Sequence, residues 1–311
     1  MLVALAGGVG AARLLAGLVE VTDPAGLTAV INTADDLVLH GLSISPDIDT
    51  VTYTLAGLDN REQGWGVAGE TWAVMDALEA LGGPSWFRLG DRDLATHLYR
   101  SDRLAEGATL SEVTAELAAR RGVTIALLPM SDDPVRTLVT IEAPGGAQEI
   151  SFQDYFVRLR HDVAVRALRF AGAESAHPAP GVLDALADAE LIICCPSNPL
   201  VSIGPILAVP GIEDLLTKRR PEVVAVSPIV GGAALRGPAD RLLRELGHEP
   251  SARGVARLYA PWVGTLVVDH ADAALAPAIE REGVRCLVTD TVMANRTRAA
   301  SLAAVVRDAL R

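Results

Sequence analysis

The sequence has few cysteines and no long hydrophobic run. Only three cysteines occur among the 311 residues, and two of them, Cys194 and Cys195, are adjacent. This usage does not make a disulfide framework and suits a reducing cytoplasm. No run of about 18 apolar residues and no basic stretch followed by an apolar one is present at either end. We therefore expect a soluble, cytoplasmic protein with no membrane partner.

Positive charge is also scarce. The chain has 27 basic and 39 acidic residues, which gives a net charge of −12. This balance argues against nucleic acid and anionic membranes as general partners, so an anionic ligand needs a local positive site. The six histidines are scattered, with no His-Glu-x-x-His and no Cys-x-x-Cys, which argues against a zinc site.

The sequence does contain a repeated alternation of short apolar runs with helical stretches. Half of the residues are hydrophobic, enough for a substantial core. We predict an α/β fold with a Rossmann-like, mostly parallel sheet flanked by helices. One domain is expected over residues 1–311, with a possible helical subregion at 45–122 beside the sheet. The predicted strands are residues 2–6, 27–31, 123–128, 191–195, 223–226, 266–268 and 286–288.

One segment breaks the alternation. Residues 137–143 and 148–152 flank Pro144, Gly145 and Gly146, which is typical of a β-hairpin. We predict a small β-hairpin insertion near 137–152, which either extends the sheet as an antiparallel edge or forms a flap.

The first strand-to-helix turn is rich in glycine. Residues 5–15 read LAGGVGAARLL, so Gly7, Gly8 and Gly10 stand between a predicted strand and a helical pattern. Bare backbone N–H groups at a helix N-terminus can hold an anion, which predicts a phosphate site. Arg13 stands where the dinucleotide fingerprint has its third glycine, and no lysine followed by serine or threonine completes a P-loop. The alternative is that the glycines only make a tight turn.

Small, turn-forming and acidic residues follow the predicted strands. Asn32, Thr33 and Asp35 follow the second strand, and Ser197 and Asn198 follow the fourth. Ligands of an open parallel sheet bind beyond the carboxyl ends of its strands, although each loop alone is typical of an ordinary turn. Carboxylates beside a phosphate would repel it unless a hard cation such as Mg²⁺ lay between them. This pattern predicts a magnesium-assisted phosphoryl-type reaction.

Two stretches outside the strand ends carry further candidates. Residues 44–51 read ISPDIDTV, in which Asp47 and Asp49 are two apart and point to different faces of a helix. We predict that Asp47 complements the helix dipole and that Asp49 is free for chemistry. Residues 89–93 read LGDRD, where Arg92 is suited to planar recognition of phosphate or a polar ring. A surface salt bridge with helix capping is the alternative.

Seven blocks along the chain resemble the 2-phospho-L-lactate transferase family of deazaflavin coenzyme F-420 biosynthesis, including its phosphoenolpyruvate-using branch. They occur in the family's order and span more than two-thirds of the chain. Val9, in the Gly-Gly-Val-Gly turn, makes the chain look more like the actinobacterial branch and favours the enolpyruvyl donor. The blocks are AGGVGAARLLAGL (6–18), NTADD (32–36), ISPDIDTV (44–51), LGDRDLATHLYRS (89–101), LPMSDDPVRT (128–137), PSNPLVSIGPI (196–206) and AVSPIVGG (225–232).

The resemblance implies an enzyme that moves a phosphoenolpyruvyl or 2-phospho-L-lactyl group. The donor is linked to guanosine diphosphate, the acceptor is the ribityl hydroxyl of the deazaflavin precursor Fo, and GMP leaves. The resemblance also implies Mg²⁺ as the cofactor, a homodimer, and Asp49 as the catalytic residue. The residues expected at the Fo site are Asp49, Arg92, Asp35 and Asp91; at the donor site, Gly7, Gly8, Gly10, Asn32, Thr33, Ser197 and Asn198; at the metal, Asp49 and Asp59.

Two other functions fit parts of the sequence. A sister family of nucleotide-sugar-binding regulators shares the glycine turn and the Asn-Thr-x-Asp-Asp loop, but the ISPDIDTV and LGDRD blocks favour the transferase. An NAD-dependent oxidoreductase is disfavoured by Arg13 and by the absence of a catalytic His or Tyr-Lys arrangement.

Overall fold

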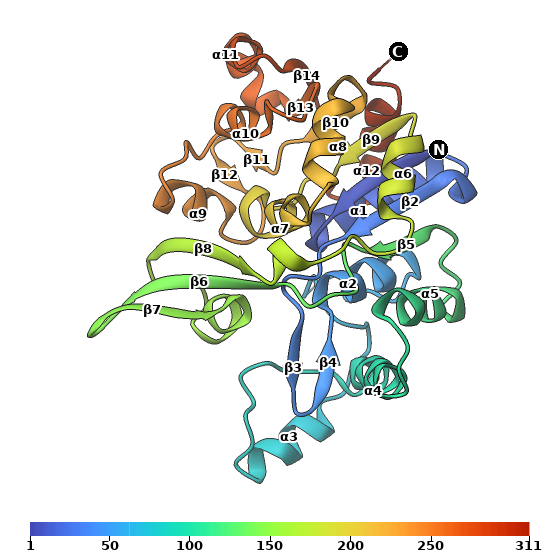
Figure 1. Ribbon diagram of the computed structural model, residues 1–311, viewed down its shortest axis with the longest axis vertical. Coiled ribbons are helices and arrows are strands. Elements are labelled where there is room, and N and C mark those ends of the chain that lie inside the picture. The colour runs from blue at the N-terminus through green and yellow to red at the C-terminus, as the bar shows by residue number, and fades with distance from the viewer. Residues whose placement is uncertain (62, 311) are drawn as a thin grey trace.

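The computed structural model describes residues 1–61 and 63–310, and a seven-stranded parallel sheet forms its centre (Figure 1). The strands in spatial order are β14 (Arg285–Thr289), β13 (Thr265–Asp269), β10 (Val223–Val226), β9 (Leu191–Cys194), β1 (Leu2–Ala6), β2 (Leu27–Ile31) and β5 (Ala126–Pro129). Every neighbouring pair in this sheet is parallel. The chain builds outward from β1 in both directions, so the strand order reverses between β1 and β9. Open α/β sheets bind ligands at such a point.

The predicted fold class is confirmed, and each of the seven predicted strands is present. The largest difference is at β5, which begins at Ala126 although the apolar run begins at residue 123. Residues 121 and 122 form a turn that ends the preceding helix, so the chain enters the sheet only after it.

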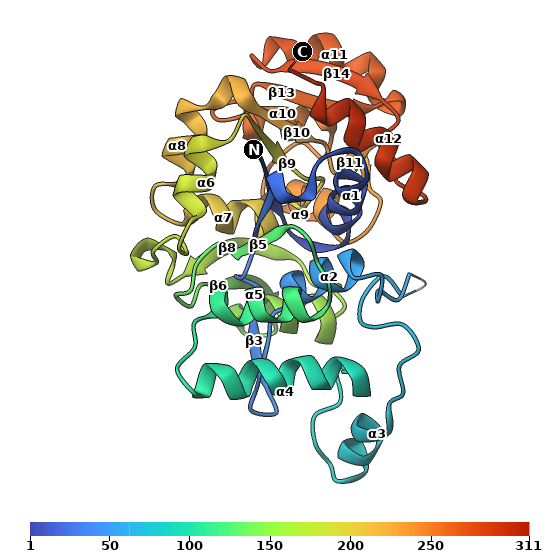
Figure 2. The same cartoon turned by 90° about the vertical axis from the view of Figure 1, so that its right-hand side faces the viewer.

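Helices cover both faces of the sheet (Figure 2). Because side chains alternate along a strand, Val3 and Leu5 of β1 belong to one buried layer and Ala4 and Ala6 to the other. The helices are α1 (Gly8–Val21), α2 (Pro46–Leu55), α3 (Ala73–Ala80), α4 (Asp91–Ala105), α5 (Leu110–Arg120), α6 (Val182–Asp188), α7 (Gly204–Ala208), α8 (Ile212–Lys218), α9 (Ala239–Glu245), α10 (Ala252–Tyr259), α11 (Ala276–Arg281) and α12 (Arg296–Arg307). Helices α6 to α11 pack on the Val3 side, and α1, α2, α5 and α12 pack on the other.

The predicted hairpin is present as β6 (Arg136–Ala143) and β7 (Gly146–Ser151). It does not join the main sheet, because β8 (Val165–Ala171) pairs with β6 and completes a separate antiparallel sheet. The sequence did not predict β8, whose two arginines and largely exposed positions hide the apolar alternation of a strand.

Helices α2 to α5 all lie within residues 45–122 (Figure 1). Thr109 and Glu112 form a capping box at the start of α5. A short hairpin, β3 (Leu37–Leu39) with β4 (Leu42–Ile44), projects below the sheet towards α3 and α4. The number of domains stays a prediction.

In the part of the chain that the structure describes, no single helix is long and apolar enough to cross a membrane. One strongly bent pair, Pro199–Ala208 with Ile212–Lys218, reaches that length and composition only when its two helices are taken together.

Candidate active site

The glycine turn lies where the strand order reverses. Gly7 follows β1 and Ser197 follows β9, and the Gly7 N–H donates to Ser197 Oγ at 3.2 Å. The structure therefore brings together two residues that were predicted from separate blocks. Asn198 has a local role, since its side-chain oxygen accepts from the backbone N–H of Leu200 at 2.9 Å and caps a short helical turn.

Each glycine of the turn has a reason in packing or backbone geometry. A Cβ on Gly7 would lie 2.6 Å from the Cβ of Ser202, and one on Gly10 would collide with the carbonyl of Pro196. Gly8 has a φ of +73°, in the left-handed region that favours glycine. The glycines are thus required by the fold itself, and the chemistry of the site depends on the side chains around them.

Asp47 lies against this turn. Its Oδ2 accepts from Asn32 Nδ2 at 2.9 Å, and its carboxylate also accepts from the backbone of Gly8. Burial raises the pKa of Asp47 to about 6, although both hydrogen bonds act in the opposite direction. Asp47 therefore does more than complement the dipole of its own helix, because its carboxylate sits at the N-terminus of α1.

Two further carboxylates follow β2, the buried Asp35 and the half-buried Asp36. Burial, followed by the charge of Asp47, raises the pKa of Asp35 well above its ordinary value, and burial raises the pKa of Asp36 to about 7. Among the described residues, Asp35 Oδ1, Asp36 Oδ1 and Thr33 Oγ1 are buried without a hydrogen-bond partner. Buried oxygens without a partner are rare in folded proteins, and they indicate a site for a cation or a donating ligand group.

The oxygens at this position fit a hard cation. Mg²⁺ prefers oxygen ligands and is usually held by one or two carboxylates together with water and substrate phosphates. Asp35 and Asp47 supply carboxylates, and Thr33 supplies a hydroxyl. Within residues 1–61 and 63–310, no three His, Cys, Asp or Glu side chains are grouped to hold a metal. A cation here would therefore need oxygens from water or a substrate as well.

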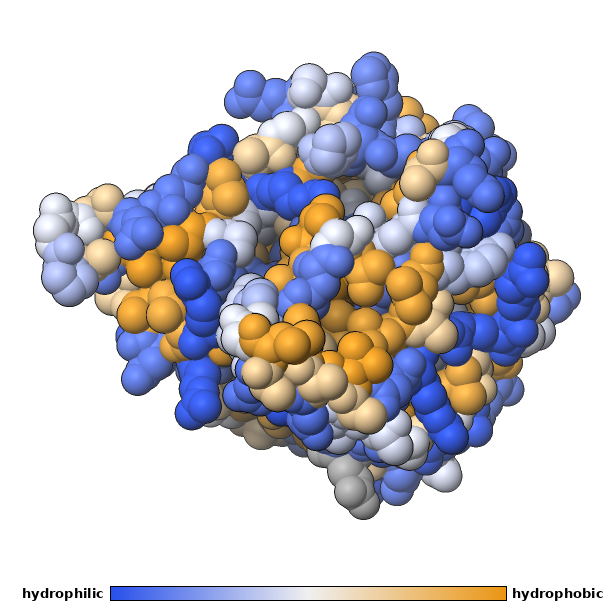
Figure 3. Space-filling model, turned by 90° about the horizontal axis from the view of Figure 1, so that it is seen from below, coloured by the Kyte–Doolittle hydropathy of each residue, from blue (hydrophilic) through white to orange (hydrophobic). Residues whose placement is uncertain are grey.

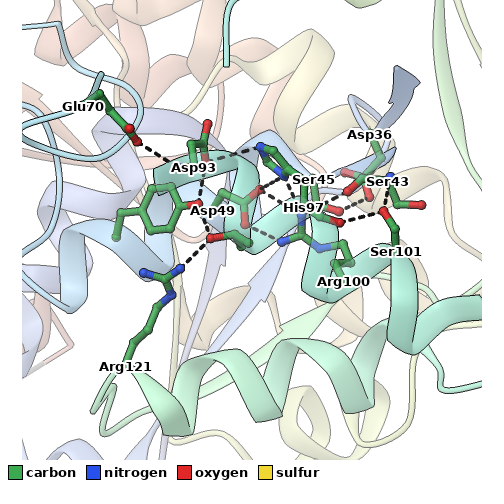
Figure 4. A network of polar contacts seen from close by, with 12 residues as sticks. Asp36, Ser43, Ser45, Asp49, Glu70, Asp93, His97, Arg100, Ser101 and Arg121 are labelled. Carbon is green, nitrogen blue, oxygen red and sulfur yellow. Dashed lines mark hydrogen bonds and ion pairs between the residues drawn. The ribbon is translucent and has the colours of Figure 1, made fainter. Parts of the chain in front are cut away.

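Asp49 is paired with an arginine, so it is not a free carboxylate in this structure, and its catalytic role stays a prediction. Arg100 of α4 donates from Nη1 to Asp49 Oδ2 at 3.1 Å and from Nη2 to the other oxygen (Figure 4). Arg100 is 0% exposed and Asp49 is 5% exposed. Burial is the largest single effect on the pKa of Arg100 and lowers it, but Asp49, Asp36 and Tyr53 together hold that pKa above its ordinary value. Asp49 thus holds α4 against α2.

The network around Arg100 includes Asp36, which is one of the three acids Asp35, Asp36 and Asp47 that we call the acid cluster. Ser45 Oγ donates to Asp36 Oδ2 at 2.7 Å, and the charge of Arg100 lowers the pKa of Asp36 against the larger effect of burial. Figure 4 shows Asp36, Ser45, Asp49 and Arg100 side by side. Asp49 affects Asp36 as well, because its own charge raises the pKa of Asp36 while the charge of its partner Arg100 lowers it.

The LGDRD block lies at the start of α4 and holds a neighbouring segment in place. Asp91 accepts from Thr71 Oγ1 at 2.5 Å and from two backbone N–H groups at the start of α3. Arg92 Nη1 donates to the Ala68 carbonyl at 3.1 Å. These contacts are those of helix capping and loop anchoring. Among the described residues, neither side chain forms a hydrogen bond or an ion pair with Asp35.

Asp59 lies at a cavity that Thr50, the neighbour of Asp49 in α2, also lines. It pairs with Arg61 at 3.7 Å and lines a small cavity near Arg13. Arg100 donates to both oxygens of Asp49 in this structure, and a metal site made by Asp49 and Asp59 stays a prediction.

A cavity of about 220 Å³ lies beside the acid cluster. Leu37, Val38 and Leu104 give it an apolar wall, and Thr33 and Asp36 stand among its polar residues. A planar molecule with polar edges would satisfy both kinds of surface. The remaining lining residues are Ser43, Ile44, Ser45, Ala108, Thr109, Leu110, Asp132, Asp133, Pro134 and Arg136.

The raised pKa of Asp36 predicts a pH-dependent stability. An acid whose pKa is about 7 when folded and near 4 when unfolded stabilises the fold most below pH 4, and this contribution is lost as the pH rises to about 7. Asp36→Asn removes the titration. Between pH 5 and pH 8, without divalent cations, the wild type should lose about 2–3 kcal/mol of unfolding free energy relative to the variant.

Urea unfolding of both proteins at the two pH values measures this difference. Glu142→Gln, which removes an exposed acid of β6, is the control and should follow the wild type at both pH values. If the free energies of unfolding of the wild type and of Asp36→Asn change equally between the two pH values, the raised pKa of Asp36 is contradicted.

Neither Asp36 nor Arg100 is among the site residues expected from the sequence. Asp36 could have been found, because it is the second of two acids directly after a predicted strand. Arg100 could not, because its partner Asp49 is 51 residues away and the contact depends on how α4 packs on α2.

Comparison with known proteins places the chain in a family. The family model of 2-phospho-L-lactate transferase CofD matches residues 2–309. A phosphoenolpyruvate transferase of Streptomyces griseus is 48% identical, and the match covers 99% of this chain and 97% of that protein. A 2-phospho-L-lactate transferase of Methanosarcina mazei is 40% identical, over 98% of this chain and 99% of its own.

A solved structure supports the fold. A member of the UPF0052 family from Bacillus halodurans superposes with a TM-score of 0.60 at 15% sequence identity. The match covers 99% of this chain and 98% of that one. At this identity the likeness concerns the fold alone.

Proposed function

This chain belongs to the 2-phospho-L-lactate transferase CofD family, and from that premise we propose its reaction. It transfers a phosphoenolpyruvyl group, or alternatively a 2-phospho-L-lactyl group, from a guanosine-diphosphate-linked donor to the ribityl hydroxyl of Fo. GMP is released, and the product enters coenzyme F-420 biosynthesis. The enolpyruvyl donor is preferred because the relative from Streptomyces griseus is named a phosphoenolpyruvate transferase.

The observation that carries this proposal is the position of the loop at residues 32–36, which lies between the cavity and the glycine turn. Thr33 and Asp36 line the 220 Å³ cavity, and the same loop holds Asn32 and Asp35 beside Asp47 and the glycine turn. With the acceptor ring in the cavity and the donor diphosphate at the glycine turn, the two ligands would lie next to each other at residues 32–36. Such positioning is most of what attack of an alcohol on a diphosphate requires.

Asp35 and Asp47 are the residues that would hold magnesium, with Thr33 beside them. The bound ion would supply neutralisation of charge on the leaving phosphate. Without a counter-charge, the buried carboxylates would repel a diphosphate, as the effect of Asp47 on the pKa of Asp35 indicates.

Asp36 is suited to accept the proton of the attacking hydroxyl. It lines the cavity, its Oδ1 has no hydrogen-bond partner among the described residues, and its pKa is about 7. A general base works best when its pKa lies near the working pH. Ser45 fixes the carboxylate by donating to the other oxygen at 2.7 Å.

The assay for this function uses purified protein, Mg²⁺, Fo and each guanosine-diphosphate-linked donor. We expect release of GMP and a phosphodiester-linked deazaflavin. The mass of the product identifies the donor, since the lactyl and enolpyruvyl products differ by two hydrogens. If neither donor turns over and Fo does not bind, the proposal is wrong.

We further propose a cytoplasmic homodimer. Figure 3 shows apolar side chains on the face seen from below, where α3 and the β3–β4 hairpin lie in Figure 1. Val74 of α3 is 52% exposed and Leu81, just after it, is 86% exposed. Burial of such side chains between two copies would favour association. Light scattering that gives the mass of one chain at assay concentration would contradict the dimer.

A further inference from the structure

Arg13 has no role in the mechanism proposed above, although it lies in α1 close to the glycine turn. It stands where a dinucleotide fingerprint would have its third glycine, four residues after Val9 on the same face of α1. Both residues line a small cavity between the start of α1, α2 and the residues Asp59, Arg61, Gly64, Trp65 and Gly66. Arg13 Nη1 makes one long contact, 3.4 Å, with the Met293 carbonyl.

Two other arginines gather at this place. Arg61 lines the same cavity, and Arg236 approaches it from the loop between β12 (Ala233–Ala234) and α9. Gly64 shows how near Arg236 lies, because a Cβ on Gly64 would collide with the guanidinium. We call Arg13, Arg61 and Arg236 the arginine cluster.

Among the described residues, the charges of the cluster are not balanced by the carboxylates around it. Asp59 is the carboxylate among the lining residues, at 3.7 Å from Arg61. Counted over residues 1–61 and 63–310, three guanidinium groups and one carboxylate leave about two positive charges together. Burial, followed by the charge of Arg236, lowers the pKa of Arg13, while Asp59 raises it. Like charges repel, so this arrangement is stabilised when an anion lies among the guanidinium groups.

The cluster lies close to the candidate active site. Arg13 follows Gly8 by five residues, which is about 7 Å along a helix axis. A ligand with an anionic group at the glycine turn and another within that span would reach both places. The net charge of the chain is −12, so a local positive site of this kind is what an anionic ligand needs.

We propose that Arg13, Arg61 and Arg236 form an anion subsite for the nucleotide-linked donor, which takes either its diphosphate or the carboxylate of its acid group. This inference rests on the proposed function for the identity of the donor. Guanidinium groups suit both anions, because their planar N–H donors match carboxylate and phosphate oxygens.

The test uses Arg236→Ala and the double variant Arg61→Ala/Arg236→Ala, since both side chains are exposed and their loss should leave the fold intact. The matched control is Arg244→Ala, an exposed arginine of α9 whose nearest carboxylate is 3.9 Å away. Calorimetry gives the Kd for GDP and for inorganic pyrophosphate, and turnover gives the KM for the donor.

We expect both variants to raise the donor KM by about tenfold or more, with Arg244→Ala at the wild-type value. A parallel rise in the Kd for GDP assigns the subsite to the diphosphate. An unchanged Kd for GDP assigns it to the carboxylate. Unchanged donor KM, GDP and pyrophosphate binding in the double variant would overturn the subsite.

Pyrophosphate separates this inference from the proposed function. If the wild type binds pyrophosphate but turns over neither donor, and the double variant loses that binding, the subsite stands and the proposed reaction fails. If turnover is normal in the wild type and all constants are unchanged in the variants, the reaction stands and the subsite fails.

Discussion

Asp47→Asn should lower kcat/KM by about two to three orders of magnitude without unfolding the protein. Asparagine keeps the shape of the side chain and an oxygen that accepts from Asn32, so the contact at 2.9 Å can survive. The variant loses the negative charge at the N-terminus of α1, next to Asp35. That charge is what would hold a cation against the diphosphate, and groups placed at developing charge have effects of this size.

Steady-state kinetics and a Mg²⁺ titration by calorimetry measure the two effects separately. Asp290→Asn, which removes an exposed acid paired with Arg298, is the control and should retain wild-type rates. Unchanged magnesium affinity together with turnover within about threefold of the wild type would remove Asp47 from the site.

Arg100→Met should lower the free energy of unfolding by about 3–5 kcal/mol. Arg100 is fully buried and donates to both oxygens of Asp49, so its removal leaves a buried carboxylate without its partner. The same substitution removes the charge that lowers the pKa of Asp36, so that acid should titrate at higher pH. Urea unfolding at pH 7 gives the stability difference.

Two further variants show whether the effect comes from the unpaired charge. Arg100→Met/Asp49→Leu removes both charges and should regain much of the lost stability, because a buried ion pair can be replaced by apolar side chains. Arg166→Met breaks an exposed pair with Glu142 and should change stability by less than about 1 kcal/mol. A loss below about 1 kcal/mol for Arg100→Met would show that the buried pair does not hold α4 to α2.

The main sheet could be predicted because its strands carry local signals. Each buried strand is a short apolar run bounded by turn residues, and the first turn follows β1 directly with three glycines. The β8 strand lacks that signal, because its pairing with β6 and not its own burial defines it. A strand of this kind is apparent only when its partner is in place.

The site was predicted in part. The blocks placed Gly7, Asn32, Thr33 and Ser197 together, since residues at the carboxyl ends of β1, β2 and β9 must share one edge. Asp91 and Asn198 carry the same residue types as binding residues, but their oxygens cap neighbouring backbone. Local sequence does not distinguish a cap from a ligand contact.

The amino-acid sequence was enough to identify the family, the order of the strands along the chain and the edge of the sheet at which a ligand site is proposed. It also determined that Asp47 and Asp49 diverge, because residues two apart cannot share a helix face. The packing of distant segments was needed to show which partner each of them has. Arg100 donates to Asp49, and Asn32 donates to Asp47. The role of a buried carboxylate depends on the charges and hydrogen bonds that distant segments bring to it.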